Sequence, residues 1–202
     1  MVATEACTFR LAKAADVPAL VRLVNAAYSG DNGRAGWTSE VHLVSGCRTD
    51  HEEIAQLVAT QEIPMLLCLL GDDVVGSVLL QRRPATAYLA MFVVKPSLQG
   101  AGFGTSLLRT AETLAQRLWG AARMTLTSIT PRPELIEFYK RRGYRLTGEF
   151  LPFPPSARVR ALVPGIELAV LRKELVYPAI DTPPPSCPLP ATAFKKPDTN
   201  LH

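Results

Sequence analysis

The sequence predicts an α/β domain built on a mixed, mostly antiparallel sheet flanked by helices. Two apolar, β-rich runs at residues 65–70 and 74–81 are joined by a Gly-Asp-Asp turn, which indicates a hairpin. Residues 87–94 are apolar on both faces, as in a central strand that is covered on both sides. The amphipathic segment 104–119 follows this strand, so we expect a helix that leads to a parallel neighbouring strand.

Helix-capping residues and hydrophobic periodicity predict the secondary structure of the first part of the chain. Residues 9–11 form a short strand, and Asp16 caps a helix that has Pro18 in its first turn. Residues 29–48 are rich in glycine and are expected to be mostly loop. Asp50, with Glu53 three residues later, is typical of a capping box before a second helix.

The later elements complete the sheet. Residues 124–128 read as a strand, and Pro133 opens a helix that ends before Gly143. Residues 144–150 and 166–175 supply the last strands. Seven of the 17 prolines lie after residue 177, so we predict a domain over 1–176 and an extended Pro-rich tail over 177–202.

Composition excludes several classes of function. The longest apolar run is eight residues, and a membrane-spanning helix needs about 20. No basic cluster precedes an apolar stretch at the N-terminus, so no secretory signal is expected. The four cysteines and three histidines lack metal-ligand spacing, and the net charge of +4 is too mild for a nucleic-acid surface. We therefore expect a cytoplasmic protein without a metal.

The stretch most informative about function is the glycine-rich turn between the strand 87–94 and the helix 104–119. Gly100, Gly102 and Gly104 let the backbone approach a ligand closely. The first turn of the helix leaves N–H donors free at its positive end. A turn of this kind suits a phosphate or pyrophosphate, and a plain connection between strand and helix is the alternative.

Two common nucleotide motifs do not fit this turn. A dinucleotide fingerprint requires a third glycine at the position of Thr105, and a triphosphate loop requires a lysine that is missing here. The pattern that fits is Gln99-x-x-Gly102-x-Gly104 after Val94-Lys-Pro96. Together with Phe138-Tyr-x-x-x-Gly143-Tyr144, it resembles the signature of the GNAT superfamily of N-acetyltransferases. The resemblance extends over the order of elements from residue 9 to 175.

The resemblance implies that acetyl-coenzyme A (acetyl-CoA) binds as co-substrate. Its pyrophosphate would lie on the turn, its pantetheine would run along the strand, and a splay between strands 87–94 and 124–128 would free backbone groups for the pantetheine amides. Gln99 would orient the turn, with a plain surface role as the alternative. The implied cofactor-binding residues are Phe92, Val93, Val94, Gln99, Gly100, Ala101, Gly102, Phe103, Gly104 and Thr105.

The resemblance also implies a catalytic residue. Tyr139 matches the tyrosine that protonates the leaving thiolate in many relatives, and a phenol can donate a proton at neutral pH. The alternative is a core tyrosine beside Phe138. Two positions depart from the family pattern: Arg132 stands where many relatives have asparagine, and the strand 87–94 has no carboxylate to act as a base. A water chain is one candidate base, and Asp50 and Glu40 are two others, each with a cap or surface role as the alternative. An acceptor amine that arrives already neutral would need no base.

The acceptor side is expected in the loop between the first two helices. Trp37 and Glu40 lie there and are the predicted substrate-binding residues, with a loop anchor as the alternative for Trp37. The segment 150–155 is expected to cross the opposite side of the same opening. Homodimers are frequent in the family, so the resemblance leaves a homodimer open.

The expected function is an acetyl-CoA-dependent N-acetyltransferase that acts on a primary amine of a small molecule or peptide by direct transfer. Two alternatives remain: a non-catalytic acyl-CoA-binding module of the same fold, and an acyltransferase that uses a longer acyl-CoA.

Overall fold

The computed structural model describes residues 7–29, 42–60, 62–84, 86–154 and 158–176. The predicted tail 177–202 lies outside these residues. The helices are α1 (Val17–Ser29), α2 (His51–Ala59), α3 (Phe103–Trp119) and α4 (Pro133–Lys140), with short 3-10 turns η1 (Ala14–Asp16) and η2 (Pro96–Leu98). The strands are β1 (Thr8–Leu11), β2 (Val44–Gly46), β3 (Met65–Leu70), β4 (Asp73–Arg83), β5 (Thr86–Val94), β6 (Arg123–Ile129), β7 (Arg145–Pro152), β8 (Val159–Ala161) and β9 (Glu167–Glu174).

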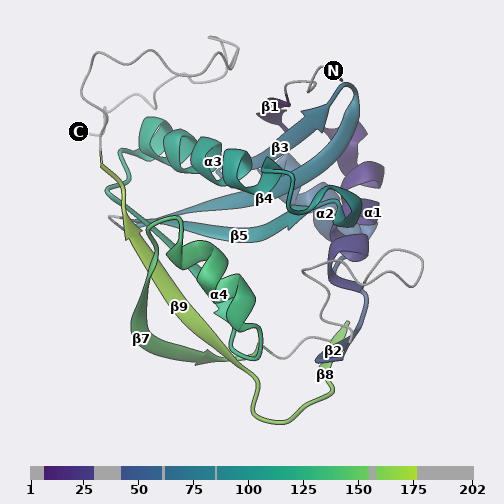
Figure 1. Ribbon diagram of the computed structural model, residues 1–202. Helices are drawn as coiled ribbons and strands as arrows, with labels where there is room; N and C mark the ends of the chain where they lie inside the picture. Colours follow the sequence, from purple (N-terminus) through teal and green to yellow (C-terminus); the bar gives the residue numbers. More distant parts are fainter. Residues whose placement is uncertain (1–6, 30–41, 61, 85, 155–157, 177–202) are drawn as a thin grey trace, which may run out of the picture.

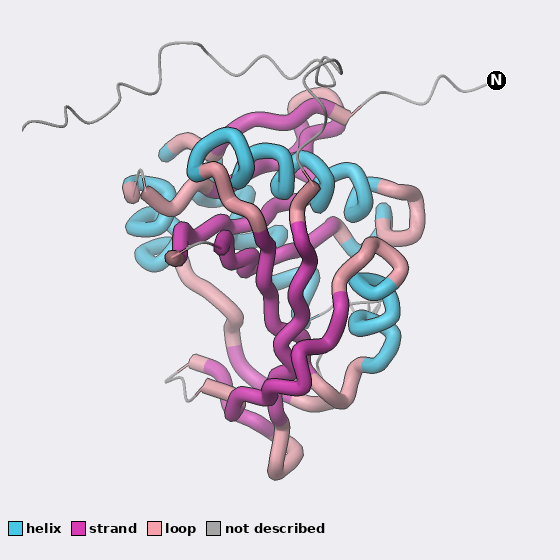
Figure 2. The backbone as a smooth tube through the Cα atoms, turned by 90° about the vertical axis from the view of Figure 1, so that its left-hand side faces the viewer, coloured by secondary structure: helices cyan, strands magenta, loops and turns pink. Residues whose placement is uncertain are grey.

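Seven of the described strands form one sheet in the order β1-β3-β4-β5-β6-β9-β7. Described neighbours in this sheet run antiparallel, except β5 and β6, which are parallel and are connected through α3. The predicted mixed, mostly antiparallel sheet with one parallel join is confirmed. Strands β2 and β8 form a separate antiparallel pair at the lower end of the molecule (Figures 1 and 2).

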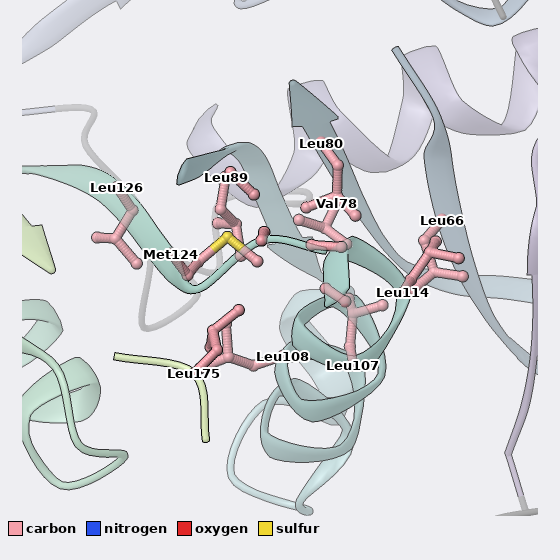
Figure 3. Close-up of a cluster of buried hydrophobic side chains, with 14 of the residues drawn as sticks. Leu66, Val78, Leu80, Leu89, Leu107, Leu108, Leu114, Met124, Leu126 and Leu175 are labelled. Atoms are coloured by element: carbon pink, nitrogen blue, oxygen red, sulfur yellow. The ribbon is translucent and has the colours of Figure 1, made fainter. Parts of the chain in front are cut away.

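Helices cover both faces of the sheet (Figure 1). Alternate residues of β3 enter different clusters: Leu66 packs with α3 on one face, and Leu67 packs with α1 and α2 on the other. This period of two explains why the sequence of β3 is apolar throughout. In the larger cluster, side chains of α3 lie against strands β3 to β6 (Figure 3). Its labelled members are Leu66, Val78, Leu80, Leu89, Leu107, Leu108, Leu114, Met124, Leu126 and Leu175.

The two predicted helix caps have different outcomes. Asp50 is confirmed as the N-cap of α2, because its side chain accepts a hydrogen bond from the Glu53 amide at 2.9 Å. Asp16 does not cap α1, because it belongs to the 3-10 turn that leads into this helix. Its carboxylate instead accepts from the Lys13 amide at 2.7 Å and pairs with the Arg10 guanidinium. The helical segment therefore begins one turn earlier than predicted.

A polar network connects α3 to β9 and to the residue that precedes β7. The carboxylate of Glu112 on α3 accepts from the Tyr144 hydroxyl at 2.9 Å and from the Lys173 ammonium on β9 at 2.7 Å. Burial, and then the Glu112 charge, raise the pKa of Tyr144, so its hydroxyl keeps the proton that it donates. The network fixes the position of α3 relative to β9.

Replacing Lys173 with methionine is expected to lower the free energy of unfolding by about 2 kcal/mol, because Glu112 would keep a mostly buried charge without its partner. Urea unfolding measures the loss. The matched control is Arg123→Met, which removes an exposed ion pair with Glu174 on the same sheet and should cost less than about 0.5 kcal/mol. Equal losses in the two variants would contradict a structural role for the buried network.

Candidate active site

Strands β5 and β6 separate partway along their length. They pair only from Ala87 with Met124 to Leu89 with Leu126, although β5 continues to Val94. Strand β6 stays paired with β9 as far as Ile129. The facing edges of β5 and β6 therefore diverge, which confirms the splay that the resemblance implied, and they leave backbone groups of β5 available to a ligand.

A bulge lies in β5 at the start of this gap. Ala90 pairs with Leu79 and Val93 pairs with Ser77, so two residues of β5 oppose one residue of β4. Met91, inside the bulge, has a φ of 47°, a left-handed conformation that methionine rarely adopts. Strained bulges of this kind occur next to functional sites, where they redirect backbone groups. No glycine marks the position, so the sequence did not predict it.

The splay opens into a cavity of about 640 Å³ that reaches both faces of the sheet. Strands β5 and β6 supply its middle, α1 and the segment before α2 supply one end, and the turn before α3 together with α4 supplies the other. Its described lining residues are Tyr28, Arg48, Tyr88, Leu89, Ala90, Met91, Phe92, Val94, Gln99, Gly100, Gly102, Gly104, Thr105, Thr127, Ser128, Ile129, Leu135, Phe138, Tyr139, Arg141, Arg142, Phe153, Pro154 and Leu168.

The glycine turn forms one end of the cavity. Gly100 and Gly102 have φ values of 85° and 93°, and a Cβ atom on either would meet no protein atom within 4 Å. Conformation, not crowding by the protein, is therefore what requires glycine there. The side-chain amide of Gln99 donates to the Val94 carbonyl at 2.9 Å and ties the turn to the end of β5.

The amides of this turn point to an anion site. Among the described residues, the backbone bonds give carbonyl partners to the amides of Ala101, Thr105 and Ser106. The amides from Gly102 to Gly104 have no such partner in the described part of the chain, and they lie at the N-terminal end of a 17-residue helix. Unpaired amides at the positive end of a helix dipole bind phosphate groups.

Arginines add positive charge beside this turn. Arg142 donates to the Thr105 hydroxyl at 2.6 Å and 3.0 Å, and its guanidinium lies 3.5 Å from the centroid of the Phe138 ring. Burial, and then the charges of Arg141 and Arg109, lower the pKa of Arg142. Arg141 and Arg142 both line the cavity at this end, and their positive charge attracts an anionic ligand.

Tyr139 lies between the cavity and the aromatic part of the core. Its ring packs against those of Phe92, Phe138 and Tyr144, with centroids 6.1 Å, 5.2 Å and 5.7 Å away. Burial raises the pKa of the Tyr139 hydroxyl well above its ordinary value; the Tyr28 hydroxyl adds to the rise and Arg142 opposes it. Tyr139 therefore stays protonated at neutral pH, as a proton donor must.

A buried hydroxyl in the cavity has no partner. Ser128 on β6 is 5% exposed, and its Oγ atom has no hydrogen-bond partner among the described residues. It alternates with Thr127, whose hydroxyl lies 2.9 Å from that of Tyr88. Ser128 therefore faces the same side of the sheet as Met124 and Leu126, the side covered by α3. An unpaired buried hydroxyl in the cavity lining fits a polar, extended ligand such as a coenzyme A arm.

The cavity brings together seven of the ten predicted cofactor-binding residues. Val93, Ala101 and Phe103 are not among its lining residues: Val93 packs toward α1, Phe103 packs against the core under α3, and Ala101 is exposed. Trp37 and Glu40 lie outside the described residues. The seven are Phe92, Val94, Gln99, Gly100, Gly102, Gly104 and Thr105.

Other residues discussed from the sequence have structural roles. Asp50 caps α2 and pairs with Arg158 at 3.2 Å, so it has the cap role that was its alternative. Arg132 is buried at the start of α4, pairs with Glu134 and does not line the cavity. Phe153 and Pro154, in the segment predicted to cross the opening, do line it.

Sequence reasoning missed the residues at the other end of the cavity. Tyr28 lies at the end of α1, Arg48 precedes α2, and the Arg48 guanidinium lies 4.4 Å from the centroid of the Tyr28 ring. Neither residue belongs to a motif. The one signal in the chain was the polarity of Tyr28 near the end of an apolar helix stripe, which is too common to carry a prediction.

Comparison with known proteins identifies the family. The model of the acetyltransferase (GNAT) family matches residues 35–144, which is more than half of the chain. This chain belongs to the GNAT family. No curated protein sequence is similar enough to count as a match.

Solved GNAT structures share the fold. The ribosomal-protein-S18-alanine N-acetyltransferase of Escherichia coli has a TM-score of 0.62 at 13% identity, over 88% of this chain and 99% of that one. The PaiA N-acetyltransferase of Thermoplasma acidophilum, solved with coenzyme A, has a TM-score of 0.61 at 14% identity, over 84% and 99%. A chimeric spermidine N-acetyltransferase, in part from Vibrio cholerae, has a TM-score of 0.61 at 14% identity, over 84% and 95%.

Membership of the GNAT family indicates acyltransferase activity, and the family uses acetyl-CoA. Among the described residues, no cluster of three or more histidine, cysteine or acidic side chains is placed to hold a metal ion. None of the helices in the described ranges has the length and apolar character needed to span a membrane.

Proposed function

We propose that this GNAT protein is an N-acetyltransferase that transfers the acetyl group of acetyl-CoA directly to a primary amine of a small molecule or peptide. The observation that carries the proposal is the cavity between β5 and β6, which extends from the glycine turn before α3 to the end lined by Tyr28 and Arg48. A ternary complex needs both ends, because coenzyme and amine must meet at one point.

Acetyl-CoA as substrate fits the α3 end of the cavity. The amides from Gly102 to Gly104 and the neighbouring arginines would hold its phosphates. The free edge of β5 would hydrogen-bond the amides of the pantetheine arm, as an added strand does at a sheet edge. The Ser128 hydroxyl would supply one further hydrogen bond on this path.

In the proposed reaction the amine nitrogen attacks the thioester carbonyl carbon, the carbon–sulfur bond breaks, and the leaving sulfur takes a proton from Tyr139. Backbone amides at the β5 bulge near Phe92 and Val93 would stabilise the negative charge on the carbonyl oxygen. The described lining holds no carboxylate. The amine would arrive neutral, and the proton that its nitrogen loses after attack would pass through water and restore the Tyr139 hydroxyl. Glu40, the other candidate base, lies outside the described residues.

Replacing Ser128 with alanine is expected to raise the dissociation constant of coenzyme A about 5-fold, the effect of one hydrogen bond worth about 1 kcal/mol. Without coenzyme the melting temperature should stay the same or rise, because an unpaired buried hydroxyl is removed. Calorimetry and thermal unfolding give the two values. Thr127→Val, on the opposite side of β6, is the control and should leave coenzyme affinity unchanged.

Release of free coenzyme A from acetyl-CoA tests the proposed function. We expect release faster than blank hydrolysis with at least one member of a broad amine panel, together with an acetylated amine in equal amount by mass spectrometry. Coenzyme binding without release on any amine would favour the non-catalytic binding module instead. Faster turnover with propionyl-CoA or succinyl-CoA than with acetyl-CoA would reassign the acyl donor.

A further inference from the structure

The inference concerns the end of the cavity opposite the glycine turn, and it rests on the proposed function. Arg48 is the charged side chain that lines this end within the described residues. It enters the cavity from the segment before α2, on the face of the sheet covered by α1. Arg141 and Arg142 line the other end, next to Thr105.

Arg48 is held in place by its backbone and by its side chain. The Asn25 side chain on α1 accepts from the amides of Arg48 at 2.8 Å and Thr49 at 3.2 Å, and donates to the Thr49 carbonyl at 2.9 Å. The guanidinium stacks on the Tyr28 ring. This arrangement fixes the arginine before any ligand arrives, which lowers the entropy lost on binding.

The positive charge of Arg48 has no carboxylate partner among the described residues. The nearest acidic residues that follow it in the chain are engaged elsewhere: Asp50 and Glu53 both pair with Arg158, and Glu52 accepts from the Gln56 side chain. The described lining of the cavity contains no aspartate or glutamate. A guanidinium in a partly enclosed space without a counter-charge attracts an anion from the ligand.

A carboxylate is the anion that fits this end best. Its two oxygens match the planar fork of a guanidinium, while the aromatic stacking of Arg48 leaves the edge of the fork open. A polycationic amine would meet like charge there. We infer that the acceptor is a small amine that also carries a carboxylate, an amino acid or a close analogue, and that Arg48 is the residue that selects it.

Matched acceptors test this inference: phenylalanine, phenylalaninamide and phenethylamine, and the corresponding methionine series. The carboxylate member should have a kcat/KM at least about 10-fold above its amide and its decarboxylated amine, as a charge-assisted hydrogen-bond pair provides. The amide has the least basic amine of each series, so the fraction of free amine works against the expected order in that comparison. The decarboxylated amine is more basic than the amino acid, so rates for that pair are compared per concentration of free amine.

The Arg48→Gln variant should abolish the preference by lowering kcat/KM for the amino acid about 10-fold or more while leaving the decarboxylated amine unchanged. Arg48→Lys should recover part of it. Arg141→Gln is the control in the same cavity, and it should change the KM of acetyl-CoA without changing the order of acceptors. Melting temperatures and coenzyme affinities of the variants confirm that they are folded.

The outcomes separate this inference from the proposed function. Release of coenzyme A with neutral or cationic amines at rates equal to the amino acids overturns the inference and leaves the proposed function standing. An equal loss on all acceptors in Arg48→Gln also overturns it, because Arg48 would then act only on the structure. If none of the amines in the panel supports release of coenzyme A, both the inference and the proposed function are overturned.

Discussion

Replacing Tyr139 with phenylalanine is expected to lower kcat about 100-fold, the lower end of what a positioned general acid contributes. The reason is the loss of a proton donor at the cavity wall, since the phenylalanine ring can keep the contacts with Phe92 and Phe138. Coenzyme affinity and the melting temperature should change little. Steady-state kinetics with saturating acetyl-CoA, together with calorimetry, separates the two effects.

The matched control is Tyr144→Phe. It removes a buried phenol hydroxyl from the neighbouring ring, but this hydroxyl donates to Glu112 and not into the cavity. The control should lose stability and keep kcat. If Tyr139→Phe turns over as fast as the unchanged protein, Tyr139 is an aromatic core residue, which was the alternative for it.

The pH dependence follows from the direction of the Tyr139 pKa shift. Burial raises this pKa, so the hydroxyl stays protonated through neutral and mildly alkaline pH. No fall in kcat from loss of the Tyr139 proton is therefore expected below the ordinary phenol value of about 10. A fall at lower pH that disappears in Tyr139→Phe would contradict the environment described for this residue.

Replacing Gly102 with valine is expected to raise the dissociation constant of coenzyme A about 100-fold. Gly102 has a φ of 93°, and a β-branched side chain is strained in that region by well over 1 kcal/mol. Relief of the strain would turn the amides from Gly102 to Gly104 away from a common point. The added methyl groups would also enter the cavity that this residue lines.

Gly148→Val is the control for backbone strain alone. Gly148 has a φ of 83° and, like Gly102, would present an added Cβ atom to no protein atom within 4 Å, but it lies on β7 away from the cavity. Both variants should lose similar stability in thermal unfolding. Only Gly102→Val should lose coenzyme binding in calorimetry, and unchanged binding would remove the glycine turn from the site.

Local signals in the sequence were sufficient for the four described helices, for the strands of the seven-stranded sheet and for one end of the cavity, but not for the β2–β8 pair. The apolar period of two in β3, the proline at the start of α4 and the Asp50 cap act over a few residues, so they can be read from the chain. Asp16 was misplaced because the Arg10 side chain, six residues away, competes for its carboxylate.

The other features of the candidate site depend on contacts between residues that are far apart in the sequence. The β5 bulge arises from register with β4, and Met91 has no local feature that distinguishes it from a strand residue. Tyr28 and Tyr139 line the same cavity, and the Tyr28 hydroxyl adds to the raised pKa of Tyr139, although more than 100 residues separate them in the sequence. Periodicity cannot report which side chains from distant elements share a space.

The sequence by itself determined the order of the described helices, the strands of the main sheet and the glycine turn, because short-range backbone preferences and hydrophobic period control them. The tertiary structure alone decided where β5 leaves β6, that the Ser128 hydroxyl has no partner among the described residues, and that Arg48 faces the cavity without a carboxylate from that part of the chain. These features depend on packing between elements, and the free energy of that packing is set by all the contacting residues together and not by any one segment.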